Sequence, residues 1–302
     1  MEQHQNLTAR LQAAGIACRE QEPLAAHTTF KIGGPAAVFV QPADEAQLCQ
    51  AVRLCRELAV PCYLLGNGSN ILFGDRGYAG AVVSLAGMKG EVRREGDTLT
   101  APAGMPLSVL CTAALRAGLT GLEFAYGIPG TVGGAVYMNA GAYGGEMKDV
   151  LLSVRYLTAE GQIEEAPAAA LDLGYRHSIF ESNGGCILSA AVGLAPGDPG
   201  AIAARMNDLM GRRRDKQPLD KPSAGSTFKR PVGAFAGALI EQCGLRGHRH
   251  GGAAISEKHC GFVVNLGGAT CADVLALCSE VQQIVKEQTG FVLEKEIRVV
   301  EL

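Results

Sequence analysis

Residues 128–144, IPGTVGGAVYMNAGAYG, decide how the chain folds and where its chemistry lies. The stretch is rich in glycine and alanine, so it has few side chains to pack and instead offers backbone N–H groups that a ligand can approach closely. The pyrophosphate of a dinucleotide is the commonest ligand of such a surface. A flexible linker is the alternative, but a linker would be polar, whereas Val132 and Val136 are apolar. Pro129 and Thr131 predict a fixed turn that leads into a short helix.

A second glycine-rich turn, LGNGSNIL at residues 65–72, follows a predicted strand. Gly66 and Gly68 allow positive φ and the close approach of a ligand. The turn departs from both G-x-G-x-x-G and the phosphate-binding P-loop, because neither a third glycine nor G-K-[ST] follows. Taken alone it is typical of an ordinary Asn-Gly turn. Together with residues 128–144 it favours a nucleotide site.

Composition limits the possible functions. The chain has 302 residues, 47% hydrophobic and 19% charged, as in an ordinary globular protein of two or three domains. Its formal net charge of −3 and its lack of tryptophan argue against binding to nucleic acid or acidic membranes. The first residues do not resemble a signal peptide and no apolar run could span a bilayer, so we expect a cytoplasmic protein. Ten cysteines without C-x-x-C spacing predict reduced thiols rather than disulfides or zinc.

Apolar periodicity predicts helices and strands along the chain. The predicted helices cover residues 7–14 (followed by a turn), a segment capped by Asp44, a segment from Pro106 to Gly118, 202–213, 235–243, and a segment from Thr270 to about Glu287. The predicted strands cover residues 38–40, 61–65, 81–85, 98–101, 152–158, 187–194, 262–265 and 291–300. The first three strands form a βαβ-type unit. Residues 196–200, PGDPG, predict a linker and a domain boundary.

Seven motifs occur together and in order. They are HTTFKIGG (27–34), LGNGSNIL (65–72), GLEFAYGIPGTVGGAVYMNAGAYG (121–144), YRHSIF (175–180), KQPL (216–219), PSAGSTFKRP (222–231) and LEKEIRV (293–299). In this set the sequence resembles the UDP-N-acetylenolpyruvoylglucosamine reductase family, flavoenzymes of bacterial peptidoglycan synthesis. Each motif alone is weak, whereas the ordered set spans nearly the whole chain and is highly specific.

The resemblance implies an α+β fold, in which a two-part FAD-binding region of the vanillyl-alcohol-oxidase type precedes a smaller α/β substrate domain. The corresponding segments are residues 1–88, 89–196 and 201–302, and the last strand returns Glu296 to the active site. The resemblance also implies FAD as bound cofactor and NADPH as reductant. The substrate would be the enolpyruvyl ether of UDP-N-acetylglucosamine and the product UDP-N-acetylmuramate. No insertion carrying an extra tyrosine loop is visible, which indicates the short class of the family, and we expect a monomer.

By the same resemblance, the FAD contacts lie in the two glycine-rich stretches, with backbone amides on the pyrophosphate. The residues concerned are Gly66, Asn67, Gly68, Ser69, Asn70, Ile128, Pro129, Gly130, Thr131, Gly133, Gly134, Asn139, Gly141 and Ala142.

Three residues are candidates for the chemistry. Hydride addition to an enol ether that bears a carboxylate leaves negative charge beside that carboxylate, so the reaction needs a cation or donor there and a proton source. By resemblance, Ser226 is the proton donor and Arg176 binds the carboxylate, which a planar guanidinium suits better than an ammonium. Glu296 is the acidic partner, either polarising the substrate or orienting the donor and a water. A turn serine, a surface ion pair and a solvated edge strand are the structural alternatives.

The resemblance assigns further residues to the substrate: Tyr175, Lys216, Arg214, Arg230 and His259. Lys216 reaches the diphosphate with help from a neighbouring arginine, although cations at a helix end also suit the helix dipole. Tyr175 either contacts the sugar nucleotide or packs in the core. Arg230 stands where some relatives have Asn, and His259 lines the substrate cleft.

We expect no metal site. His248, His250 and His259 include a His-x-His spacing, but on loop residues this spacing is more often polar surface, and no carboxylate or Cys completes a ligand set in the sequence.

Two other functions fit parts of the sequence. One is an oxidase of sugars or alcohols in the same fold family, which would release hydrogen peroxide instead of consuming NADPH. The other is a nucleotide-sugar binding module without flavin, which would be colourless when purified.

Overall fold

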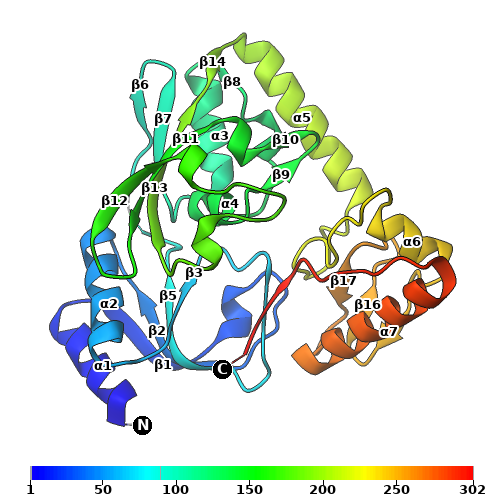
Figure 1. Cartoon of the computed structure of the whole chain (residues 1–302), viewed down its shortest axis with the longest axis horizontal. Helices are drawn as coiled ribbons and strands as arrows, with labels where there is room; N and C mark the ends of the chain where they lie inside the picture. Colours follow the sequence, from blue (N-terminus) through cyan, green and yellow to red (C-terminus); the bar gives the residue numbers. More distant parts are fainter. Residues whose placement is uncertain (1, 89, 302) are drawn as a thin grey trace. The chain divides into compact units, whose positions relative to one another are not determined.

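The computed structural model describes residues 2–88 and 90–301, which form two compact units (Figure 1). The first unit contains the chain up to Arg19, Val38–Asn67 and Ala81–Arg213. The second contains Glu20–Ala37, Gly68–Gly80 and the chain from Arg214 onward. Each unit is therefore assembled from three separate segments. Within the described parts of the chain, no helix is both long and apolar enough to cross a membrane.

The first unit contains a five-stranded antiparallel sheet with the order β12-β11-β13-β7-β6. Its strands are β6 (Arg93–Glu95), β7 (Thr98–Pro102), β11 (Leu151–Leu157), β12 (Ile163–Pro167) and β13 (Cys186–Gly193). Leu188, Ala190 and Val192 are buried on one face of β13, as the two-residue period of a strand requires. Helices α3 (Leu107–Arg116) and α4 (Val132–Tyr137) lie beside this sheet (Figure 1) and share its core.

A second sheet has the order β1-β2-β5-β3, formed by β1 (Ala17–Pro23), β2 (Pro35–Gln41), β5 (Tyr78–Ser84) and β3 (Cys62–Leu65). Strands β3 and β5 are parallel. Helices α1 (Glu2–Ala13) and α2 (Glu45–Glu57) belong to the first unit, and the predicted cap of α2 is confirmed because Asp44 accepts the N–H of Gln47 at 2.9 Å. The turn that begins at Gly66 directly follows β3, as predicted.

In the second unit, helix α7 (Cys271–Thr289) packs on a three-stranded antiparallel sheet of β15 (Arg249–His250), β16 (Ala253–Ile255) and β17 (Val263–Asn265) (Figure 1). Helix α6 (Ala236–Gln242) contributes to the same core. The predicted capping box begins α7: the hydroxyl of Thr270 accepts the N–H of Asp273, and the Asp273 carboxylate accepts the N–H of Thr270.

Shorter elements complete the chain. They are β4 (Ile71–Phe73) parallel to β18 (Arg298–Val300), β8 (Leu119–Thr120) with β14 (Ala195–Pro196), β9 (Gly141–Ala142) with β10 (Gly145–Glu146), helix α5 (Pro199–Lys216), and the 3-10 turns η1 (Leu24–His27), η2 (Glu123–Ala125), η3 (Met147–Asp149), η4 (Ala168–Ala170) and η5 (Ile179–Glu181).

Two expectations about chain segments were wrong. The helix over residues 7–14 was expected to be followed by a turn, but residues 17–23 form strand β1. This strand lies at a sheet edge and none of its residues is buried, so its sequence shows no apolar alternation. Residues 196–200 do not form a linker, because Pro199 begins α5 and the Asp198 carboxylate accepts the N–H of Ala201 at 2.8 Å. Proline is well tolerated at the first helical position. The assignment of residues 1–88, 89–196 and 201–302 to separate ligands stays a prediction.

The predicted strand over residues 291–300 is shortened to β18. Before β18 the chain has another backbone partner: Lys229 donates its N–H to the carbonyl of Glu294, and Glu296 donates to the carbonyl of Thr227, each across 2.8 Å. After this pairing, Arg298 donates to the carbonyl of Asn70 across 2.9 Å. The segment therefore changes partner midway, which apolar alternation does not reveal.

A contact between two histidines and one carboxylate joins β15 to α7. Nε2 of His248 lies 2.9 Å from Oε2 of Glu280, and Nδ1 of His250 lies 2.7 Å from Oε1. These hydrogen bonds lower the pKa of Glu280, that from His248 most. The sequence did not reveal Glu280 as the shared partner because it lies far along the chain. In the described parts of the chain, no group of three or more His, Cys, Asp or Glu is arranged to hold a metal ion.

We expect Glu280→Gln to lower the thermal midpoint modestly at neutral pH, because exposed contacts of this kind contribute about 0.2–1 kcal/mol each. Since folding lowers the pKa of Glu280, its stabilising contribution is present above the unfolded-state pKa of about 4.3 and is lost as the pH falls through the lower folded-state value. Thermal scans from neutral to acidic pH should show the difference between variant and wild type closing. A difference that stays constant into strong acid would contradict this account.

Candidate active site

In the first unit the two glycine-rich stretches lie against each other. The side-chain amide of Asn67 donates a hydrogen bond to the carbonyl of Pro129 across 2.7 Å. A Cβ added to Gly66 would stand only 2.7 Å from Oγ1 of Thr131, so any larger residue would force a shift. The two loops that the sequence assigns to a nucleotide are therefore neighbours, and glycine is what allows them to approach so closely.

Thr131 organises the second loop. Its hydroxyl accepts the N–H of Gly134 at 3.2 Å and so caps α4, the short helix predicted after Pro129. Gly133 is buried, and a Cβ there would lie 2.8 Å from the Cβ of Ala103. Gly134 is exposed, and a Cβ there would meet nothing within 4 Å except Thr131. Of the two adjacent glycines, Gly133 serves packing and Gly134 presents backbone at the surface.

Asn139 is fully buried with a φ of 39°, and its side chain binds the protein itself. The amide nitrogen donates to the Glu146 carboxylate at 2.8 Å and to the Gly174 carbonyl at 2.9 Å, while the amide oxygen accepts the N–H of Lys148 at 2.9 Å. Because both ends of the amide are engaged, Asn139 ties the glycine-rich loop to the segment that carries Tyr175.

Arg176 follows directly in that segment. Its φ of 56° lies in the left-handed region, which is uncommon for a residue with a Cβ. One guanidinium nitrogen donates to the carbonyl of Gly141 across 3.4 Å, and Cζ lies 5.1 Å from the ring centroid of Tyr175. Tyr175 is 49% exposed, which excludes the core alternative for this ring. The predicted carboxylate-binding arginine is therefore placed at the glycine-rich loop.

Arg213, near the end of α5, also faces this loop. Its Nε is buried and has no hydrogen-bond partner within the described chain, and it lies 3.2 Å from where a Cβ on Gly127 would stand. Burial lowers the pKa of the Arg213 guanidinium, and a hydrogen bond with Tyr143 opposes this effect. Arg213 thus touches residues at both ends of the glycine-rich loop, and its buried nitrogen fits a polar ligand group.

The sequence alone does not distinguish Arg213 from its neighbours in the run 212–214. Arg212 pairs with Asp208, and Arg214 is exposed. The helical period could have predicted that residue 213 lies on the buried face of α5. Ile202, Met206 and Leu209 are the buried positions of α5, and the next position on that face is 213.

In the second unit, the remainder of the first glycine-rich turn contacts other predicted motifs. Gly68 has a φ of 60°, and a Cβ there would lie 2.4 Å from the carbonyl oxygen of His27. The Gly68 carbonyl accepts the N–H of Thr29 across 3.2 Å. The side-chain amide of Asn70 donates to the carbonyl of Glu296 across 3.2 Å. The turn therefore fixes the segment that carries the predicted acidic residue.

Ser226 and Glu296 lie on paired segments of the second unit. Glu296 donates its backbone N–H to the carbonyl of Thr227, the residue after Ser226. Thr227 is buried and makes two more hydrogen bonds. Its N–H donates to the Gly261 carbonyl across 2.8 Å, and its hydroxyl accepts the N–H of Val263 across 2.9 Å. The backbones of the two segments that carry Ser226 and Glu296, far apart in the sequence, are therefore paired.

Of the other predicted substrate residues of the second unit, three are exposed and His259 is half-buried. Arg214 and Lys216 are both exposed at the end of α5. The guanidinium of Arg230 lies over the ring of Phe235, with Cζ 3.9 Å from the centroid. Burial lowers the pKa of His259, and the charge of Lys216 acts in the same direction, so these two side chains are within electrostatic reach of each other.

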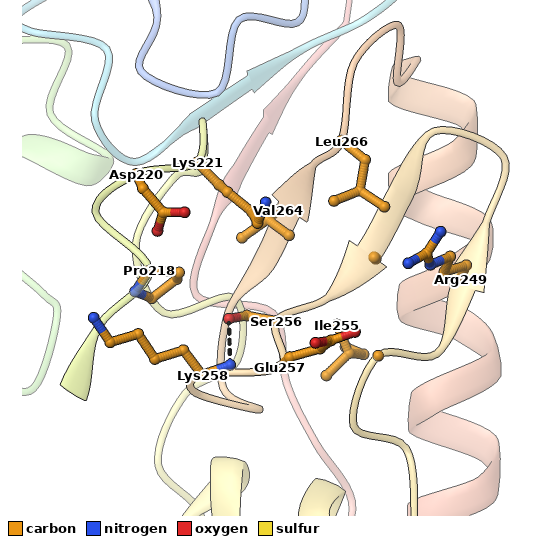
Figure 2. Close-up of a pocket in the computed structure, with 12 residues that line it drawn as sticks. Pro218, Asp220, Lys221, Arg249, Ile255, Ser256, Glu257, Lys258, Val264 and Leu266 are labelled. Atoms are coloured by element: carbon orange, nitrogen blue, oxygen red, sulfur yellow. Dashed lines mark hydrogen bonds between the residues drawn. The ribbon is translucent and has the colours of Figure 1, made fainter. Parts of the chain in front are cut away.

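A cavity of about 230 Å³ in the second unit is a separate feature (Figure 2). Its walls carry Lys221, Arg249 and Lys258 together with Asp220 and Glu257. Ligand pockets usually enclose about 300–1,000 Å³, and none of the predicted site residues lines this cavity. We therefore do not take it as the active site.

Comparison with known proteins agrees with this arrangement. Residues 36–166 match an FAD binding domain, and residues 217–300 match the C-terminal domain of UDP-N-acetylenolpyruvoylglucosamine reductase. The chain is 47% identical over 278 residues to that reductase from Clostridium perfringens, covering 92% of this chain and 91% of the relative. The reductase from Agathobacter rectalis is 45% identical over 307 residues, with 98% and 97% covered. The crystal structure of the Thermus caldophilus enzyme aligns with a TM-score of 0.79 and 35% identity, covering 95% of this chain and 99% of that chain.

An FAD-binding domain followed by a reductase domain, with two neighbouring loops of bare backbone, defines a flavin-dependent oxidoreductase. The predicted fold, an FAD-binding region followed by a second domain of the reductase family, is confirmed. At this identity and coverage the chain belongs to the UDP-N-acetylenolpyruvoylglucosamine reductase family. It is an enzyme of peptidoglycan precursor synthesis that uses FAD and NADPH.

We expect Gly66→Ala to weaken FAD binding, because its methyl group would displace Thr131 and with it the cap of α4. The dissociation constant should rise by about tenfold or more, as a loss of ~1.4 kcal/mol produces. The measurement is flavin absorbance per mole of purified protein, with circular dichroism to verify folding. Gly211→Ala, in open space on α5, is the matched control. Equal retention of FAD by both variants would refute the role of the contact.

Proposed function

We propose that this chain reduces the enolpyruvyl ether of UDP-N-acetylglucosamine to UDP-N-acetylmuramate with electrons from NADPH, and that Ser226, Arg176 and Glu296 carry the chemistry. Family membership supports the reaction. One observation supports the roles: the backbone hydrogen bond between residues 296 and 227, which pairs the segment that carries Glu296 with the segment that carries Ser226. When bound, FAD supplies the hydride that the double bond accepts.

The residues that would hold FAD are the two glycine-rich loops and Arg213. The contact between Asn67 and Pro129 keeps the loops together, and Gly134 presents main chain that a pyrophosphate can approach. The buried Nε of Arg213 offers a donor to a polar group of the cofactor. Asn139 acts here through positioning, because its side chain is occupied by protein partners.

Ser226 protonates the substrate carbon next to the carboxylate. Hydride arrives at the terminal vinyl carbon, the double-bond electrons move onto the adjacent carbon, and that carbon takes the proton of the serine hydroxyl. A serine hydroxyl is a weak acid, so it acts only when its position is fixed and its proton can be replaced. The three backbone and side-chain bonds of Thr227 supply the fixed position.

Arg176 and Glu296 serve the charge that develops during this step. The guanidinium of Arg176 is permanently charged and planar, so it matches a carboxylate and the enolate formed beside it. Its hydrogen bond to Gly141 keeps it at the glycine-rich loop. Glu296 is held by Asn70 on one side and Thr227 on the other, which suits it to orient the proton donor or a water that reprotonates it.

Finer features belong to the same proposal. We keep the short class as part of this proposal, because no insertion that carries an extra tyrosine is visible in the sequence. The ten cysteines are all free thiols, which suits a reducing cytoplasm. We propose that the enzyme acts there as a monomer. Further contacts with the substrate would come from Lys216, Arg214, Tyr175, Arg230 and His259.

For Ser226→Ala we expect flavin reduction by NADPH to keep its wild-type rate, because that half-reaction requires no proton from the serine. Turnover of the enolpyruvyl substrate should fall by about 10²–10⁴-fold, the usual contribution of a general acid. Stopped-flow absorbance of the flavin separates the two half-reactions.

Ser223→Ala, three residues upstream on the same segment, is the matched control and should change neither half-reaction, because the contact of Ser223 with Thr29 uses its backbone carbonyl. Equal loss of both half-reactions in Ser226→Ala would overturn the assignment of Ser226 as proton donor.

A further inference from the structure

A tight hairpin presents Arg176. Gly174 and His177 exchange both backbone hydrogen bonds, across 3.1 and 3.3 Å, so Tyr175 and Arg176 are the two residues of the turn between them. The φ of Arg176 is 56°, in the left-handed region that favours glycine or asparagine at the second position of such a turn. A residue with a Cβ keeps this backbone only where its surroundings hold it. The placement of the Arg176 side chain therefore depends on the groups that fasten the hairpin.

Residues that flank the turn attach the hairpin to the glycine-rich loop and to α4. The carbonyl of Gly174 accepts a hydrogen bond from the side-chain amide of Asn139 across 2.9 Å. The hydroxyl of Ser178, which is buried, donates to the carbonyl of Tyr137 at the end of α4 across 2.7 Å. These contacts fix where the hairpin lies, and the shape of the turn itself needs a further constraint.

The imidazole of His177 bridges the two ends of the hairpin segment. Its Nε2 lies 3.2 Å from Oδ2 of Asp172, which precedes the hairpin, and its Nδ1 contacts Oε2 of Glu181, which follows the hairpin in η5. The backbone also joins these ends once, because the N–H of Ile179 donates to the carbonyl of Leu171 across 2.9 Å. One ring thus ties the chain that enters the hairpin to the chain that leaves it.

Backbone strain lies on both sides of this clamp. Asp172 has a φ of 46° and Arg176 a φ of 56°, so two residues with a Cβ are left-handed within five positions. His177 bonds to the first through its side chain and to the second through the peptide link. Exposed contacts of this kind contribute little to overall stability, and strained residues gather at functional sites. The consequence of the clamp is therefore local, in the geometry of the turn.

We propose that His177 is a positioning residue for the reaction: by bonding to Asp172 and Glu181 it keeps the hairpin in the conformation that presents the Arg176 guanidinium to the substrate carboxylate. This inference rests on the proposed function, because it takes Arg176 as the group that binds this carboxylate. A guanidinium stabilises developing negative charge only while it is correctly placed, and an error of about 1 Å can slow a reaction by about 10²-fold. In this role His177 requires no contact with the substrate.

The test follows both half-reactions of FAD-loaded His177→Ala by stopped-flow absorbance of the flavin. Reoxidation by the enolpyruvyl substrate should slow roughly ten- to a hundredfold, because Arg176 loses its fixed position. Reduction by NADPH should keep its wild-type rate. The matched control is His250→Ala, because His250 also contacts a carboxylate, that of Glu280, and its side chain is 42% exposed against 40% for His177. This control should change neither half-reaction.

A double-mutant cycle separates positioning from a general loss of stability. In an Arg176→Ala background, His177→Ala should slow reoxidation no further, because residues that act through one group have non-additive effects. Asp172→Asn is a second variant. Asparagine tolerates the φ of 46° at this position, so the change weakens the clamp and keeps the backbone. It should slow reoxidation less than His177→Ala, because Glu181 still holds the ring.

Two results would rule out the positioning role. One is reoxidation at the wild-type rate in a folded His177→Ala variant, and the other is a double variant in which the two losses multiply. If His177→Ala does not fold, an unchanged reoxidation rate in Asp172→Asn is the contradicting result. An Arg176→Ala variant that reoxidises its flavin at the wild-type rate would instead refute the proposed role of Arg176, and with it the inference that rests on that role.

Discussion

Close packing of bare backbone is the constraint on which the rest of the structure depends. At Gly66, Gly68 and Gly133 an added Cβ would come within 3 Å of other protein atoms, so these loops keep their positions only because they have no side chains there. Ordinary apolar cores elsewhere in each unit supply the burial that such loops cannot. The fold thereby fixes two stretches of main chain and leaves Gly134 at the surface, and backbone that a ligand can approach is what a nucleotide cofactor requires.

The turn after β3 makes side-chain contacts with the second glycine-rich loop and with the segment that carries Glu296. Asn67, in the first unit, holds the second glycine-rich loop through Pro129. Three residues later Asn70, in the second unit, holds the backbone of Glu296, which in turn pairs with the residue after Ser226. In the proposed site, hydrogen bonds to the main chain of Thr227 and Glu296 would hold the proposed reacting residues in position.

The helices with strong capping residues could be predicted from the sequence. The caps Asp44 and Thr270 placed α2 and α7 because capping is a local property of the chain. The edge strand β1 has no buried residue and so no apolar pattern to detect. The pairing of residues 227–229 with 294–296 joins distant segments, which only the family motifs indicated. Arg213 was missed because a run of three arginines is typical of a polar helix end, although the buried face of α5 continues to that position.

Arg213 shows why a buried polar residue without a protein partner is hard to predict from the rules of folding alone. A buried donor without a partner destabilises a folded chain by about 1–3 kcal/mol, so folding alone would favour an apolar side chain at that position. The opposite holds once a ligand provides the missing acceptor, because the ligand then stabilises the folded state by its own binding free energy. A polar group that is unfavourable in the empty protein and satisfied in the loaded one links cofactor affinity to fold stability. If Arg213 holds FAD as proposed, the link runs through its guanidinium, which lies beside Gly127 and bonds with Tyr143.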